Sequence, residues 1–174
     1  MALEKNAATE SLWAFIVAKN PLLDTVPYSD VVFDSVDVLT GGKEGRNAKL
    51  TFSTTDTEKH GEGTAAVKYY RLTPDQFIPN APEVIIVPPG AEQAEVDAMA
   101  IAQVQAVVDA ARPEAQVGYT IKAQNYNDTI VTVRVTYDSV FAVGFMDIIV
   151  PTERTPKKLS DNVDDADLDG FKPE

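Results

Sequence analysis

The spacing of hydrophobic positions changes several times along the chain, and the first segment has helical spacing. Residues 8–19 carry an apolar stripe on one side of a helix, formed by Leu12, Phe15 and Ile16. Thr9 is a suitable N-cap, and Asn20-Pro21 ends the pattern. Trp13 lies beside the stripe and broadens the predicted buried face. The sequence therefore predicts an N-terminal helix over residues 8–19.

From Tyr28 the spacing changes to two, which is typical of half-buried strands. A first strand closes at Gly41-Gly42, a second runs from 47 to 55 and a third from 64 to 72. The loop 56–63 carries the single histidine, His60, for which we expect an exposed position. Three short consecutive strands favour an antiparallel meander.

The middle of the chain carries the strongest helical pattern. Thr73-Pro74-Asp75 predicts no more than a helical turn, and Val84 to Val87 predicts a brief strand. Residues 91–112 then place seven apolar side chains on one broad face: Val96, Met99, Ile101, Val104, Val107, Val108 and Ala111. Glu92 and Glu95 suit the N-terminal end of this helix, and Pro113 stops it.

Three more strands follow, over residues 118–123, 129–137 and 139–150. Gly144 indicates a bulge within the last strand, and Pro151 marks its end. The predicted fold class is α+β: two small antiparallel β groups, 28–72 and 118–150, joined by the helix 91–112, which packs on both. Residues 1–151 form the domain, and residues 152–174 form an extended acidic C-terminal arm.

Composition narrows the functional classes. The chain has 174 residues and a net charge of −12, which disfavours nucleic acids and anionic membranes as partners. It has no cysteine, and therefore no disulfide, thiolate nucleophile or zinc-thiolate site. No apolar run reaches the roughly 20 residues that span a bilayer, and no secretion signal is visible at the start. We expect a soluble protein made in the cytosol.

One motif suggests a metal. Asp165, Asp167 and Asp169, followed by Gly170, match the start of a calcium-binding loop, in which alternating carboxylates converge on the ion. The loop also needs a bidentate Glu at its twelfth position, and Glu174 falls two positions short of it. A solvated acidic arm is the competing interpretation. No other cofactor is expected, and His60 has neither a second histidine nor a cysteine with which to build a metal site or a nucleophilic centre. The chain is therefore not expected to be an enzyme.

Several short motifs carry a family resemblance, which covers roughly residues 10–150. They are Leu12-Trp13-Ala14-Phe15 with Asn20-Pro21, Tyr28-Ser29-Asp30-Val31, Asn47-Ala48-Lys49-Leu50, Val67 to Leu72, Tyr137-Asp138-Ser139 and Val143-Gly144-Phe145. In this order they resemble a domain family of virion structural proteins of large tailed bacteriophages. Tyr70 departs from the family's usual Asn, and no catalytic residue is implied.

The resemblance implies a particle component, present in many copies, that is made in the host cytoplasm and located in the virion. We expect a capsid-bound decoration or cementing protein whose neighbours include the major capsid protein. The acidic arm is expected to extend onto a neighbouring subunit, with Lys157, Lys158, Leu159 and Phe171 in that interface. The alternatives are a tail-tube or head-tail connector subunit with an acidic bore, and a small calcium-dependent binding module.

Overall fold

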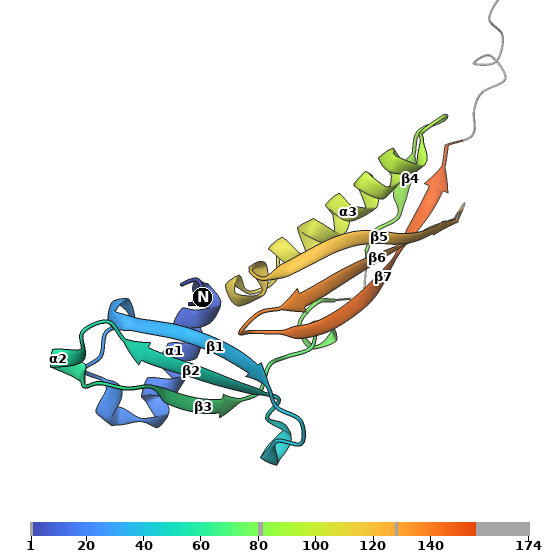
Figure 1. Cartoon of the computed structure of the whole chain (residues 1–174). Coiled ribbons are helices and arrows are strands. Elements are labelled where there is room, and N and C mark those ends of the chain that lie inside the picture. The colour runs from blue at the N-terminus through green and yellow to red at the C-terminus, as the bar shows by residue number, and fades with distance from the viewer. Residues whose placement is uncertain (1, 80–81, 128, 156–174) are drawn as a thin grey trace, which may run out of the picture.

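The computed structural model describes residues 2–79, 82–127 and 129–155, and these form two lobes in an elongated molecule (Figure 1). The first lobe contains α1 (Ala7–Lys19), β1 (Val31–Val38), β2 (Ala48–Thr54), α2 (Thr57–His60) and β3 (Ala65–Tyr69). The second lobe contains β4 (Ile85–Val87), α3 (Gln93–Asp109), β5 (Tyr119–Asn127), β6 (Ile130–Asp138) and β7 (Val143–Arg154). The mixed α+β class is therefore confirmed.

In the first lobe, three strands pair antiparallel in the order β1-β2-β3, which confirms the predicted meander. Alternation along β2 buries Ala48, Leu50 and Phe52 against α1. The indole of Trp13 meets the ring of Phe52 edge to face, with 5.5 Å between the ring centroids. The core of this lobe is thus small and rich in aromatic side chains.

Two details of α1 differ from the sequence prediction. Its N-cap is Asn6, whose side chain accepts from the backbone N–H groups of Ala8 and Thr9. Thr9 is instead the third helical residue, and its hydroxyl accepts from the Asn6 N–H in a reciprocal capping box. The buried face centres on Trp13 and Ile16, whereas Phe15 is 67% exposed. The helix therefore has an apolar buried face, but Phe15 does not belong to it.

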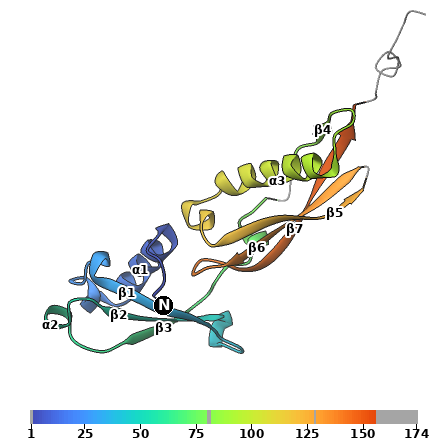
Figure 2. The same ribbon diagram turned by 45° about the horizontal axis from the view of Figure 1, so that its top comes forward.

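In the second lobe, the strand order is β4-β7-β6-β5, and α3 covers one face of the sheet (Figure 2). The fully buried positions of α3 recur every four residues: Val96, Ala100, Val104 and Val108. They meet the inward positions Val131, Val133 and Val135 of β6 in one core cluster. The predicted helical turn is also present, as a 3₁₀ turn over Pro74–Gln76, and its neighbour Ile78 joins the same core.

The prediction that the long helix packs on both strand groups is wrong. The buried side chains form two separate core clusters, and α3 contributes only to that of the second lobe. The second sheet is also mixed, because β4 pairs in parallel with β7. Hydrophobic periodicity identifies the apolar face of a helix but not which of two sheets it meets.

The last strand continues past the predicted end at Val150. It pairs with β6 up to Pro151 and then with β4 from Thr152 to Arg154. Pro151 has no N–H to donate, and it lies where the strand changes its partner. Residues 152–154, which we expected to open the acidic arm, therefore belong to the sheet. β5 likewise extends to Asn127, beyond the predicted end at residue 123.

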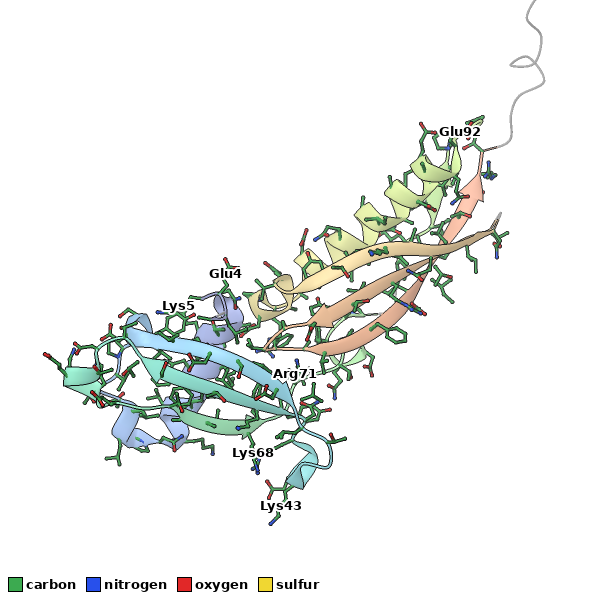
Figure 3. All side chains as sticks on the ribbon, in the orientation of Figure 1. Glu4, Lys5, Lys43, Lys68, Arg71 and Glu92 are labelled. Carbon is green, nitrogen blue, oxygen red and sulfur yellow. The ribbon has the colours of Figure 1, made fainter. Side chains whose placement is uncertain are left out.

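The two lobes meet at a polar junction, where Figure 3 shows Arg71. The Arg71 side chain is buried, and its Nη1 donates to the Ser139 carbonyl oxygen at 3.2 Å. The Asn47 side chain holds the Arg71 backbone through two hydrogen bonds. On the other side of the junction, the Ser11 hydroxyl of α1 donates to Glu114 of the second lobe at 2.7 Å. The lobes are therefore joined by specific hydrogen bonds in addition to the connecting chain.

Candidate assembly surfaces

The predicted calcium ligands Asp165, Asp167 and Asp169 lie outside the described residues. The same holds for the predicted interface residues of the arm: Lys157, Lys158, Leu159 and Phe171. Over residues 2–79, 82–127 and 129–155, no group of three or more His, Asp or Glu side chains is arranged to hold a metal ion. In the same residues, no helix is long and apolar enough to cross a membrane.

His60 is not exposed as predicted. Its imidazole is 3% exposed, and Nε2 lies 3.1 Å from a carboxylate oxygen of Asp30. This hydrogen bond is the main reason that the pKa of Asp30 is lowered, with a smaller contribution from Ser29. The pair fastens α2 to the beginning of β1. It joins the end of α2 to the turn that precedes β1, and we assign it a structural role.

The second sheet has one face that α3 does not cover, which we call the open face. It carries polar side chains of β6, such as Thr132 and Thr136, together with three large apolar side chains. Its outward side chains along β7 are Phe145 and Ile149, which are 59% and 51% exposed. Ile86 of β4 is 55% exposed and points the same way by register, opposite Glu153. Figures 1 and 2 show α3 on the other side of the sheet. Large apolar side chains gathered on one face are typical of a contact surface.

The one charged pair at the centre of the open face is internally neutralised. Arg134 donates two hydrogen bonds to Asp147, at 2.7 and 2.8 Å, in a bidentate pair. The guanidinium also lies 4.1 Å from the centre of the Phe145 ring. Hydrogen bonding to Arg134 lowers the pKa of Asp147 and keeps it ionised. The pair therefore adds no net charge to the open face.

A second surface is a groove between α1 and the edge strand β3, here called the α1–β3 groove. Leu12, Phe15, Val67 and Tyr69 supply its apolar lining, in a depression of about 470 Å³. It continues toward the lobe junction as a smaller depression of about 180 Å³, where Tyr70 and Phe141 join the lining. Tyr70 is 48% exposed.

The rim of the α1–β3 groove is basic, in contrast to the acidic chain as a whole. Lys19, Arg46 and Lys68 line the larger depression. Arg46 is paired with Glu44 at 2.6 Å, and Arg112 at the other end is paired with Glu114. Lys19 and Lys68 form no ion pair with any described residue. Two lysines without an ion-pair partner therefore border the groove, Lys19 from α1 and Lys68 from the outer side of the edge strand β3, where it lies opposite Lys49.

Tyr69 lies in the wall of this groove. Its hydroxyl is buried without a hydrogen-bond partner among the described residues, and burial raises the pKa of Tyr69 to about 12. An unpartnered buried hydroxyl costs stability, on the order of 1–3 kcal/mol. The buried Tyr69 hydroxyl in the groove wall therefore lowers the stability of the isolated fold.

Neither surface was identified from the sequence. A signal for the open face was present, because Ile148, Ile149, Val150 and Pro151 are apolar at consecutive positions, whereas a strand with one wet face alternates. The groove had no such signal, since it joins residues about 50 positions apart along the chain. A scan against protein-family models finds no match, and no curated protein or solved structure matches the chain.

Proposed function

We propose that this chain is a bacteriophage virion structural protein, attached to the capsid as a decoration or cementing protein, and that it has no catalytic activity. The observation that carries the proposal is the open face of the second sheet. Three large apolar side chains, Ile86, Phe145 and Ile149, are each more than half exposed there. Because each is already about half buried, covering the rest would contribute roughly 1–1.5 kcal/mol per side chain before the cost of association.

The distribution of charge supports attachment through one side. A decoration protein is expected to gather its apolar contacts on one base and to turn its acidic groups outward. In the second lobe, the open face carries the exposed apolar side chains Ile86, Phe145 and Ile149, and α3 forms the opposite layer. The solvent side of that helix carries Glu92, Glu95 and Asp109, which are all exposed. The acidic layer would then face solvent and keep the particle surface soluble.

The proposed partner is the major capsid protein, and the proposed location is the virion. A capsid presents the same site many times, so many copies of the chain would bind equivalent positions. The family resemblance over residues 10–150 supports this placement, since it implies a particle component without catalytic residues.

The test uses full-length protein and purified particles lacking it. Ile149→Asp places a charge in the proposed contact and should lower occupancy on the particle by about tenfold or more, because about 1.4 kcal/mol corresponds to tenfold in affinity. Leu22→Asp is the matched control, since Leu22 is 94% exposed on the first lobe and should have no effect. Occupancy is measured by quantitative gel densitometry and by a cryo-EM map.

Equal occupancy of the wild type and the Ile149→Asp variant would refute attachment through the open face. A map that places the chain in hexameric rings around a central bore would favour the tail-tube alternative. In that case acidic side chains should line the bore, because like charge keeps DNA from adhering to it.

A further inference from the structure

We propose that the α1–β3 groove is the docking site for residues 156–174 of a second copy of this chain. The proposal rests on the proposed role in assembly and specifies which surface of the neighbour receives the acidic arm. It commits to one occupant, because charge, side-chain type and chain geometry each select it.

The arm and the groove carry opposite charges. Residues 161–169 contain five aspartates and no basic residue. The groove rim carries Lys19 and Lys68, which are exposed and have no ion-pair partner among the described residues. Most of the surface of a chain with net charge −12 repels such an acidic segment, whereas this groove attracts it.

The arm and the groove both also offer apolar side chains. Among and just after its aspartates the arm carries three large apolar residues: Val163, Leu168 and Phe171. The groove offers the exposed ring of Phe15 together with Leu12, Val67 and Tyr69. An extended segment can therefore place apolar side chains on the lining and carboxylates at the rim. Lys157 and Lys158 precede the aspartates, so they stay outside the groove when residues 161–171 occupy it.

The position of the end of β7 decides between the same chain and a second copy. The last described strand, β7, ends at Arg154 beside β4, at the end of the second lobe farthest from the first lobe (Figures 1 and 2). β7 has 12 residues. An arm that returned to its own groove would need about 12 extended residues merely to run back along that strand, at roughly 3.3 Å per residue. Residues 156–167 would be used up in this way, leaving most of the aspartates outside the groove. A second copy has no such restriction.

The test exploits the absence of cysteine from the chain. One full-length variant carries Asn20→Cys in the groove wall, and a second, affinity-tagged variant carries Ala166→Cys amid the aspartates. Neither substitution removes a charge. On mild oxidation we expect the mixed disulfide to form about tenfold faster than with Thr120→Cys, an exposed control on β5, since docking raises the local concentration.

A second variant pair tests the charge argument. Adding Lys19→Glu and Lys68→Glu to the Asn20→Cys chain should reduce the rate to that of the Thr120→Cys control. Lys122→Glu, a reversal of an exposed lysine on the other lobe, should leave the rate unchanged. Circular dichroism of each variant establishes that it is folded. High salt should slow the reaction, because the Debye length falls to about 3 Å at 1 M.

Three outcomes would overturn the proposal: equal rates at Asn20 and Thr120, no effect of the double charge reversal, or a disulfide within one chain when both cysteines are present in the same molecule. No particle is needed for these measurements. Their failure would therefore remove the groove as the docking site and leave the Ile149→Asp result on particles to stand or fall separately.

Discussion

The two lobes have the same arrangement of layers and differ in the side chains on the uncovered face of the sheet. Each is a small sheet with a helix on one face. On the open side of the first sheet, β2 presents Lys49, Thr51 and Ser53. On the open side of the second sheet, β7 presents Phe145 and Ile149. The strands of the first lobe alternate apolar and polar positions, as is typical of a sheet with one face in solvent. The second sheet has large apolar side chains on both faces.

This difference indicates that the two lobes have different tasks. Leaving a large apolar side chain in water forgoes roughly 1.5–3 kcal/mol that burial would contribute. Large apolar side chains on the outer face of a sheet thus favour a second surface that covers them. The first lobe has a polar outer sheet face, and two of its exposed apolar side chains, Phe15 and Tyr70, lie at the α1–β3 groove instead.

The largest expected effect comes from breaking the core of the first lobe alone. Phe52→Ala removes a 4% exposed ring that packs on Trp13, and should lower the free energy of unfolding by about 3–5 kcal/mol. Because the two cores are separate clusters, amide hydrogen exchange should accelerate in β1 to β3 and remain slow in β5 to β7.

The reciprocal control is Val133→Ala in the second lobe, which should accelerate exchange in β5 to β7. Uniform acceleration throughout both lobes in either variant would mean that they unfold as one cooperative unit. The comparison between independent lobes would then fail.

The junction should respond to pH through Glu114. Hydrogen bonds from Arg112 and Ser11 lower the pKa of Glu114 to about 2 from 4.5. Its contribution to stability is fully present above pH 4.5 and is lost as the pH falls toward 2. Glu114→Gln should lower the melting temperature at pH 7 by a few degrees, corresponding to about 1 kcal/mol, and the difference should vanish near pH 2.

Glu83→Gln is the matched control, because Glu83 is exposed in a loop. It should melt with the wild type at every pH, as followed by circular dichroism. A Glu114→Gln deficit that persists unchanged at pH 2 would show that the carboxylate charge is not what holds the junction.

The smallest expected effect on stability concerns the open face itself. Ile149→Thr keeps a β-branched residue in the strand and should change the free energy of unfolding by no more than about 0.5 kcal/mol in urea titrations. Occupancy on the particle should fall at the same time, because Ile149 lies in the proposed contact. A loss above about 2 kcal/mol would mean that Ile149 is part of the core, contrary to its 51% exposure.

Local pattern predicted most of the elements. Alternation in β2 and β6 and the four-residue recurrence in α3 are visible in the sequence because each depends on neighbours a few positions apart. Phe15 was assigned to the buried face because it shares a helical stripe with Ile16. Which member of a stripe is covered depends on the sheet that the helix meets, and the stripe does not contain that information.

Long-range pairing accounts for the remaining differences. β4 has only three residues and finds its parallel partner in β7 more than 60 positions later, so no local pattern signals the pair. His60 and Asp30 are likewise 30 positions apart, and a histidine in a polar loop gave no sign of burial. The groove and the open face also depend on contacts between segments that are far apart in the sequence, which explains why neither was predicted.

The placement of β7 between β4 and β6 has a mechanical consequence. A pull on Thr155 would act along the strand, perpendicular to most of the hydrogen bonds that hold β7 on both edges. Bonds loaded in this direction share the force and must break together, whereas a peeled edge strand loses them one after another. The C-terminal end of β7 is therefore well placed to resist tension. A load applied there would be shared by the pairings of β7 with β4 and with β6 before the strand separated.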